Sequence, residues 1–359
     1  QAVLVERLNE LLLELRTQAG ATQGQIVEGV LVGNTAMHHL FAGLPVRQLG
    51  FVSYVPAVSE PMTFPAHQVN LHLAPGSYAY LPPNIAGFVG ADHVAMLVAT
   101  RILEKQGNII AIDIGTNSEV SLLVGGRLLT CSCASGPAFE GAHIRDGMRA
   151  VPGAIERVKI QDGSVFAQTV DGKLAVGICG SGILDAVAEM YGSGILNRSG
   201  RFAENHPGSG GASIAHEFTL VPAARTGHGR SVGVTPSDVG EIQLSKGAIR
   251  AGIEILLQES GLDRTAVDEF IIAGAFGTYL DVESALRIGM FPAVPLERFR
   301  QVGNAAGIGA QWMLVSRAKR DEAVEIIRRV QYVDLTTHPG FSRIFAQALR
   351  FPAEVEASA

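Results

Sequence analysis

The chain has 359 residues, of which 47% are hydrophobic, 17% charged and 6% aromatic. This length exceeds that of one ordinary domain and predicts two lobes or an elaborated α/β unit. The 42 glycines follow no three-residue period, which excludes a collagen-like chain, and the net charge of −6 argues against a nucleic-acid binder that works through a basic surface. No apolar run approaches the roughly 18 residues of a membrane-spanning helix, so the sequence predicts no membrane span.

The number of cysteines indicates the cellular compartment, and the first residue bears on whether the chain is a piece of a longer protein. Cys131, Cys133 and Cys179 are too few for a disulfide framework in a chain of this size, and no secretory leader is visible, so we expect a reducing cytoplasm. The chain opens at Gln1 directly on a helical pattern, which we interpret as a piece of a longer protein.

The predicted elements of the N-terminal part begin with an amphipathic helix over 2–19 that ends at Gly20. A buried strand over 26–32 then leads into the helix TAMHHLF. Residues 44–83 are rich in proline and include Pro82-Pro83, so we predict an extended, weakly structured connection there. Helical periodicity returns over 90–105.

The middle of the chain predicts strands over 108–113, 119–124 and 127–133, with a tight turn after Asp113. Two short strands follow around 155–170, then a strand over 174–178, the sequence CGSG and the helix GILDAVAEMY. Residues 197–213 are polar and glycine-rich, which favours a surface loop.

The last part begins with a long helix from Thr235 to about Ser260, because Thr235 is a good N-cap and Pro236 suits the first helical position. A strand over 270–273 ends at GAFG, and Gln301-Val302 lead into a helix at AAGIGAQWMLV. A helix over 321–330, the strand VQYVDL and the helix FSRIFAQAL close the chain. The pattern V-G-N-x-A occurs at both 32–36 and 302–306, which hints at a duplicated α/β unit.

The hairpin turn of Asp113, Gly115, Thr116 and Asn117 is the strongest candidate for chemistry. An acidic residue at the end of a buried strand needs a cation or donor. Gly115 lets the backbone approach a ligand, Thr116 and Asn117 supply donors, and Asp113 can reach a hydrated Mg²⁺. The alternative is an ordinary turn whose polar groups satisfy only the local backbone.

Two further glycine-containing breaks accompany the hairpin. Gly274, Ala275, Phe276 and Gly277 end a late strand in small residues, which leaves room for a flat ring such as adenine or serves a close strand–helix crossing. Gly180, Ser181 and Gly182 open a helix whose backbone N–H groups face an anion or form a plain N-terminal turn.

The order of these motifs resembles the superfamily of actin, sugar and acetate kinases and heat-shock chaperones. The segments VGNTAMHHL, IDIGTN, SGPAFEGAHIRDGMRAVPGAIERV, ICGSGILDAVAE, LSKGAIRAGIEILL, IIAGAFG and VGNAAGIGA resemble more closely the ATP-dependent reductive activators of corrinoid proteins, over nearly the whole chain. The resemblance implies an α/β, ribonuclease-H-like fold with mixed sheets flanked by helices. It implies that residues 1–107 are the remainder of a first lobe, including the proline-rich connection at about 44–83. Residues 108–359 would be the second lobe with a C-terminal helical and strand extension.

The same resemblance implies a function and its partners. Members of that family return a Co(II) corrinoid methyl-transfer protein to Co(I) with ATP and an electron donor, and we expect a homodimer. Asp113 and the turn after it would hold ATP and Mg²⁺, and residues 274–277 would border the adenosine. Glu140 would orient a water or metal near the γ-phosphate or only cap backbone groups, and the exposed Arg145 and Asp146 would contact the partner or do nothing specific.

Two departures from the family pattern leave alternatives open. The three cysteines cannot supply a four-cysteine cluster motif, so a [2Fe–2S] group is expected only on a preceding domain. The earlier D-I-G-T hairpin of the first lobe is also missing. A small-molecule kinase of the same superfamily and a non-catalytic corrinoid-protein docking or dimerisation module are therefore the competing hypotheses.

Overall fold

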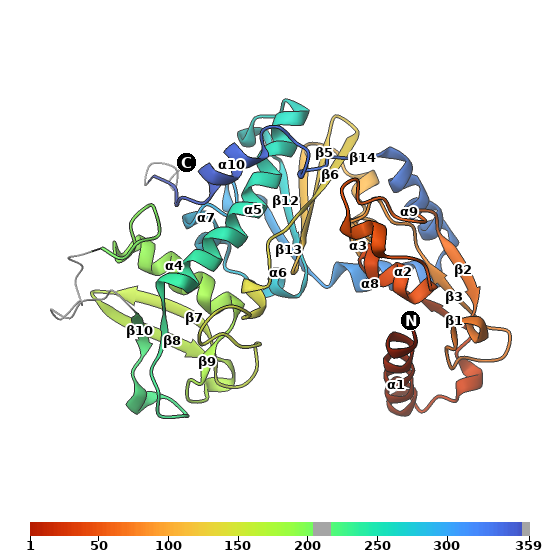
Figure 1. The fold of residues 1–359 in the computed structure, drawn as a ribbon, viewed down its shortest axis with the longest axis horizontal. Coiled ribbons are helices and arrows are strands. Elements are labelled where there is room, and N and C mark those ends of the chain that lie inside the picture. The colour runs from red at the N-terminus through yellow and green to blue at the C-terminus, as the bar shows by residue number, and fades with distance from the viewer. Residues whose placement is uncertain (204–216, 354–359) are drawn as a thin grey trace. The chain divides into compact units, whose positions relative to one another are not determined.

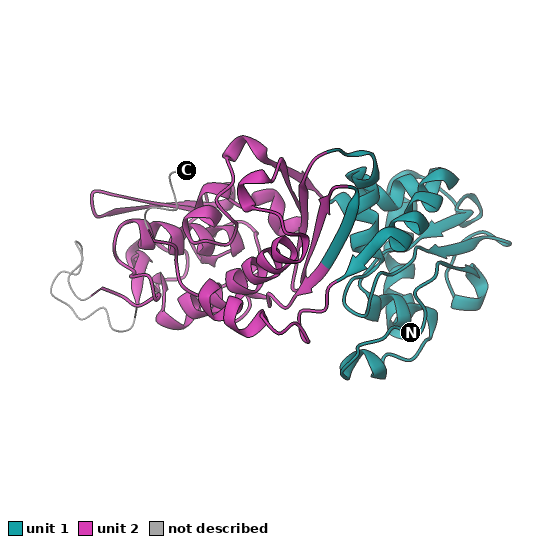
Figure 2. Cartoon of the chain, turned by 90° about the horizontal axis from the view of Figure 1, so that it is seen from above, with its two compact units in different colours: residues 1–106, 126–130, 304–332 teal, residues 107–125, 131–303, 333–359 magenta. Residues whose placement is uncertain are grey.

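The computed structural model describes residues 1–203 and 217–353 of the chain, which fall into two compact units (Figure 2). Unit 1 consists of residues 1–106, 126–130 and 304–332, and unit 2 holds the remainder. The chain therefore passes through most of unit 2 before it returns to unit 1 at residue 304. The sequence-based boundary between residues 107 and 108 stays a prediction.

Unit 1 contains a three-stranded sheet in the order β1-β3-β2, made of β1 (Glu28–Val30), β2 (Met62–Pro65) and β3 (Tyr78–Leu81) (Figure 1). Strand β3 is parallel to β1 and antiparallel to β2. Helices α1 (Ala2–Ala19) and α2 (Thr35–Ala42) contribute Val5 and Phe41 to the same buried cluster as Leu81. The predicted first helix is thereby confirmed, whereas the predicted strand over 26–32 shortens to three residues.

The prediction that residues 44–83 form a weakly structured connection is wrong. This segment supplies β2 and β3, and its Leu71 and Leu73 are buried in the core of unit 1. The prolines are compatible with strands because Pro65 is the last residue of β2, which lies at the edge of the sheet, where a missing N–H is tolerated.

The rest of unit 1 is largely helical, with α3 (Ala91–Ala99), α8 (Ala305–Val315), α9 (Arg317–Arg329) and β14 (Val330–Tyr332). Helices α3 and α8 pack closely because Gly309 has no side chain: a Cβ there would lie 1.9 Å from the Ala95 carbonyl oxygen. Both V-G-N-x-A segments begin helices. The Asn34 side chain accepts the Met37 N–H, and that of Asn304 accepts the Gly307 N–H, each at 2.9 Å.

Unit 2 is built on β4 (Ile109–Ile114), β5 (Ser118–Val124), β12 (Glu269–Ala273) and β13 (Phe299–Gly303), in the order β13-β12-β4-β5. Strand β12 is parallel to both β13 and β4, and β5 is antiparallel to β4, so the sheet is mixed. Strand β6 (Arg127–Cys133) follows β5 in the chain, and its first part pairs with β14 in unit 1. This arrangement places the carboxyl ends of β4 and β12 side by side.

Helix α5 (Pro236–Ser260) is the longest in the part of the chain that the structure describes. Thr235 is its N-cap, as the sequence predicts, and forms a reciprocal capping box with Asp238. Gly261 ends the helix in a left-handed conformation. The helix packs on the sheet closely enough that a Cβ at Gly252 would lie 2.3 Å from the Cys133 sulfur. Cys131 and Cys133 are buried, as expected for small core residues.

The remaining elements of unit 2 complete its outer layers. A second sheet has the order β8-β7-β9, with β7 (Ala154–Gln161), β8 (Ser164–Thr169) and β9 (Gly177–Ile178), and a hairpin pairs β10 (Phe218–Val221) with β11 (Val232–Val234). The helices are α4 (Gly180–Gly192), α6 (Ala275–Tyr279), α7 (Val282–Arg287) and α10 (Phe341–Ala348). Most of the predicted 197–213 loop lies outside the described residues. None of the described helices is long and apolar enough to cross a membrane.

Candidate functional site

Asp113 and Gly274 lie together at the carboxyl ends of neighbouring parallel strands. Ala273 of β12 is paired with Asp113 of β4, and the next residue, Gly274, has a φ of +95°. A Cβ at Gly274 would lie 2.6 Å from the Ile114 carbonyl oxygen and 2.8 Å from Asp113 Oδ1. Only glycine therefore allows the β12 backbone to approach the Asp113 carboxylate this closely.

The turn of residues 115–117 is exposed, and two buried serines hold it from beneath. The Ser135 hydroxyl lies 3.3 Å from the carbonyl oxygens of both Gly115 and Thr116. Ser135 is in turn 2.8 Å from the Ser118 hydroxyl. The turn is thus fixed on its inner side, while Gly115, Thr116 and Asn117 remain accessible to a ligand on the outer side.

Glu140 belongs to a short 3-10 helix, Ala138–Glu140, which follows β6 in the chain. This helix contacts both the hairpin turn and the residues that follow β12. The Thr116 hydroxyl donates a hydrogen bond to the Glu140 carboxylate. The neighbouring Phe139 ring stacks on Phe276 of α6, with centroids 4.5 Å apart and an interplanar angle of 12°. The structure therefore brings Asp113, Glu140, residues 115–117 and residues 274–277 into one connected region of unit 2.

The glycines of the predicted anion-binding turn at residues 180–182 have a clear packing role. A Cβ at Gly180 would lie 1.9 Å from the Phe139 carbonyl oxygen, and one at Gly182 would lie 2.1 Å from that of Ile155. Gly180, Ser181 and Gly182 are all buried. The first turn of α4 thus supports the loop that carries Phe139 and Glu140, and direct anion binding by this turn stays a prediction.

The end of β12 is also packed by the chain itself. A Cβ at Gly277 would lie 2.8 Å from Ile272 Cγ2, and the Gln301 side-chain amide donates to the Gly277 carbonyl at 2.7 Å. Ala275 is exposed and Phe276 half-buried. The sequence-based role of residues 274–277 beside adenosine remains a prediction, and Phe276 presents the stacking surface such a role requires.

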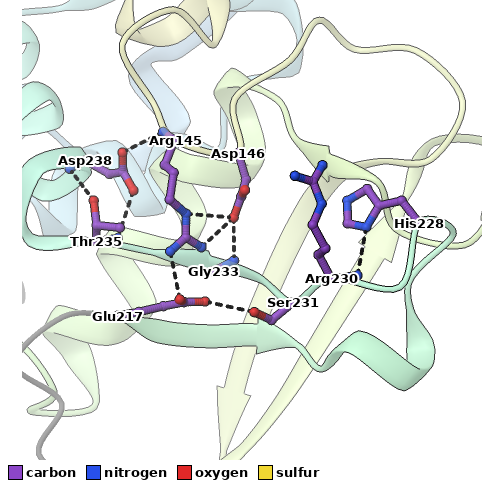
Figure 3. Close-up of polar contacts among 9 residues, drawn as sticks. All are labelled: Arg145, Asp146, Glu217, His228, Arg230, Ser231, Gly233, Thr235 and Asp238. Carbon is purple, nitrogen blue, oxygen red and sulfur yellow. Dashed lines mark hydrogen bonds and ion pairs between the residues drawn. The ribbon is translucent and has the colours of Figure 1, made fainter.

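Arg145 and Asp146, predicted to contact a partner or do nothing specific, take part in a network within the chain (Figure 3). The Arg145 guanidinium contacts Asp146 Oδ2 at 2.6 Å and Glu217 Oε2 at 2.7 Å, and its backbone N–H donates to Asp238 Oδ1 at 2.8 Å. Asp146 also accepts the Gly233 N–H at 3.0 Å. These bonds tie the loop after Glu140 to the start of α5 and to β11.

The network changes the ionisation of its members. The hydrogen bond from Arg145 holds the pKa of Glu217 below its usual range, and the carboxylates of Glu217 and Asp146 raise the pKa of Arg145 further. Arg145 therefore carries a permanent charge between two carboxylates. Its contribution is to position the loop.

The residues present do not fit an iron–sulfur cluster. Cys131, Cys133 and Cys179 are buried. The Cys179 sulfur lies 3.3 Å from the Ile155 carbonyl oxygen, whereas the sulfurs of Cys131 and Cys133 lie against Gly252 of α5. Within residues 1–203 and 217–353, no group of three or more His, Cys, Asp or Glu side chains could hold a metal ion. A single carboxylate such as Asp113 suits Mg²⁺ better, because that ion keeps several of its waters.

Sequence reasoning does not find three positioning residues: Ser135, Phe139 and Asp238. Ser135 and Phe139 precede Glu140 within the motif SGPAFEG, so this motif is the sequence signal that could have indicated them. The sequence places Asp238 only in the first turn of α5. Its buried carboxylate also receives the Arg145 N–H, a contact that local sequence does not encode.

The mixed sheet, the hairpin turn and the strand ending at Gly274 define a nucleotide-binding α/β domain of the ASKHA type. One family model, described as the C-terminal domain of RACo, the ASKHA domain, matches residues 107–358. A second, described as the RACo middle region, matches residues 1–105. The chain belongs to the RACo family, which confirms the sequence-based resemblance and the fold class.

Similar proteins carry names consistent with that family. The chain is 31% identical over 357 residues to "Corrinoid activation enzyme RamQ" of Eubacterium limosum, covering 97% of this chain and 60% of that protein. It is 26% identical to "[Co(II) methylated amine-specific corrinoid protein] reductase" of Methanosarcina barkeri, covering 97% of this chain and 66% of that protein. A solved "Reductive activator for corrinoid,iron-sulfur protein" matches with a TM-score of 0.87 and 36% identity, over 97% of this chain and 56% of the other. The chain thus spans about three fifths of the relatives it matches.

Proposed function

We propose that this chain is the ATP-binding part of a reductive activator that returns a Co(II) corrinoid methyl-transfer protein to Co(I). The observation that carries the proposal is the meeting of the Asp113 carboxylate with the Gly274 backbone, beside an exposed turn at 115–117. Family membership and the names of the relatives support the corrinoid protein as the partner.

The residues take separate roles in this proposal. Thr116, Asn117 and the Gly115 backbone bind phosphate oxygens, while Asp113 binds Mg²⁺ through water. Glu140 orients the attacking water once the nucleotide displaces its hydrogen bond from Thr116. Phe276, backed by Phe139, borders the adenine ring. Mg²⁺ would supply charge neutralisation at the phosphates.

Calorimetry with Mg-ATP tests the nucleotide site. We expect the wild-type chain to bind Mg-ATP and Asp113→Ala to lose at least about tenfold in affinity, since the metal would lose its carboxylate. Asp162→Ala, at the exposed turn between β7 and β8, is the matched control and should bind like wild type. Equal affinities of Asp113→Ala and wild type, with both folded, would contradict the proposal.

The activator role needs a separate assay. A purified Co(II) corrinoid protein, an electron donor and ATP are mixed with the chain, and the cobalamin absorption spectrum is followed. The proposal predicts an ATP-dependent change toward Co(I). Phosphorylation of a small molecule without a spectral change would favour the kinase hypothesis, and corrinoid-protein binding without any ATP effect would favour the docking module.

The electron donor and the oligomeric state complete the proposal. Because the described residues do not fit a [2Fe–2S] cluster, we propose that the electron comes from a group held elsewhere. We also propose a homodimer, which light scattering on the purified chain tests directly.

A further inference from the structure

A pocket of unit 2, separate from the proposed nucleotide site, is lined by arginines. It has a volume of about 730 Å³ and is bordered by α5, α10 and the residues that follow α10. Its charged lining consists of Arg198, Arg250, Arg343, Arg350 and Glu254, which we call the arginine pocket. Four guanidinium groups against one carboxylate leave a net charge of three positive units. A volume of this size suits a small molecule.

The floor of the arginine pocket is firmly built. The buried Lys246 ammonium donates to the Arg350 carbonyl at 2.6 Å and lies 5.3 Å from the centre of the Phe351 ring. The Phe351 N–H donates to the Arg198 carbonyl at 2.9 Å, and the Gln243 amide donates to the Leu349 carbonyl at 2.9 Å. The segment from Leu349 to Phe351 is therefore held in place.

The arginines differ in how their charges are balanced. Arg250 is paired with Glu254 at 2.7 Å and also donates to the Phe291 carbonyl at 2.7 Å. Among the residues that the structure describes, the guanidinium groups of Arg343 and Arg350 form no hydrogen bond or ion pair. Both residues are exposed and line the pocket.

Lys246 is a further basic group, in contact with the pocket residues Arg350 and Phe351. Its ammonium group has no carboxylate partner among the described residues, and burial together with the nearby Arg250 lowers its pKa to about 7. Burial is the larger cause, because it removes the water that stabilises the ammonium group, and the positive charge of Arg250 adds to it. An anion in the pocket would offset the charge of Arg250.

We propose that the arginine pocket binds a small free anion of the phosphate class that carries at least two negative charges. Guanidinium groups match phosphate oxygens with paired N–H donors, and the four arginines come from three separate segments that converge on one cavity. The proposal does not depend on the nucleotide site, because none of the residues lining the arginine pocket belongs to that site.

Titration calorimetry with inorganic pyrophosphate, in the absence of Mg²⁺, tests the proposal on the full chain. We expect binding by wild type and a loss of about tenfold or more in affinity for the double variant Arg343→Ala/Arg350→Ala. The control Arg225→Ala/Arg230→Ala removes the same two charges from exposed positions outside the pocket and should retain wild-type affinity. Binding should also weaken as salt is raised.

Further variants distinguish the arginine pocket from the proposed nucleotide site. Asp113→Ala should keep pyrophosphate binding while losing Mg-ATP, so failure of one proposal is distinguishable from failure of the other. Arg343→Lys/Arg350→Lys keeps the charge but loses the paired donors, and an affinity between those of wild type and the alanine variant is expected. Equal losses in the pocket and control variants would overturn the proposal. Binding of heparin or an acidic protein without any pyrophosphate binding would also overturn it.

Discussion

Gly274 is the residue on which the geometry of the candidate site most depends. Its φ of +95° already disfavours any side chain, and a Cβ would collide with the Ile114 carbonyl oxygen and with Asp113 Oδ1. Asp113 cannot move away freely, because it is paired with Ala273 of β12 on one side and with Glu119 of β5 on the other. The glycine therefore couples backbone conformation to the position of the proposed metal-binding carboxylate.

We expect Gly274→Ala to lower the free energy of unfolding by about 3 kcal/mol, since the conformational strain of about 1–3 kcal/mol is joined by the clash. Urea unfolding of the purified chain measures the loss. Gly163→Ala is the matched control, because Gly163 has a φ of +75° and a Cβ there would meet no atom within 4 Å. It should show the conformational cost alone, and equal losses in the two variants would rule out the clash.

At the scale of elements, the start of α5 and the loop after Glu140 share the Asp238 carboxylate. One Asp238 oxygen accepts the Thr235 N–H at 2.8 Å, and the other accepts the Arg145 N–H at 2.8 Å. Arg145 then links the loop to Glu217 and Asp146 through its side chain. The capping residue of a long helix thus also fixes the loop that carries Glu140.

Asp238→Ala should lower the free energy of unfolding by about 2 kcal/mol, because it removes a helix cap and leaves the Arg145 N–H without its acceptor. It should also weaken Mg-ATP binding through the displaced loop. Asp263→Ala is the control, since Asp263 caps only the exposed 3-10 helix Arg264–Ala266. Chemical denaturation and calorimetry measure both effects. A variant as stable as the control would show that the shared carboxylate contributes nothing beyond an ordinary cap.

The same elements show what the sequence could predict. Helices α1 and α5 and the β4–β5 hairpin follow from local signals: apolar periodicity, the Thr235 cap, and turn residues after Asp113. Strands β2 and β3 do not follow from such signals, because each has four residues among prolines and their pairing with each other and with β1 depends on tertiary contacts.

At the scale of the whole molecule, the site of unit 2 draws on segments far apart in the chain. The sequence order of the motifs indicates which segments belong to the candidate site. It could not predict that Gly274 abuts Asp113, that Phe139 stacks on Phe276, or that Gly180 accommodates the Phe139 carbonyl. Each of these contacts depends on strand register and loop packing, which are set by the complete fold.

Ligand binding should therefore be visible as a pattern over the whole chain. A ligand at about 100 times its dissociation constant adds about 2.7 kcal/mol to the free energy of unfolding, and the segments it contacts should open less often. In hydrogen exchange read by mass spectrometry, we expect Mg-ATP to slow exchange in residues 113–117, 135–140 and 273–278. Pyrophosphate should instead slow exchange in residues 341–353 and in α5 around Arg250.

The two ligands act as controls for each other in this experiment. Asp113→Ala should lose the Mg-ATP pattern and keep that of pyrophosphate, and Arg343→Ala/Arg350→Ala should do the opposite. Protection of residues 341–353 by Mg-ATP, with no change at 113–117, would place the nucleotide phosphates in the arginine pocket and contradict the assignment of the hairpin. Separate patterns would establish two anion sites within unit 2, because each variant then removes one of them without affecting the other.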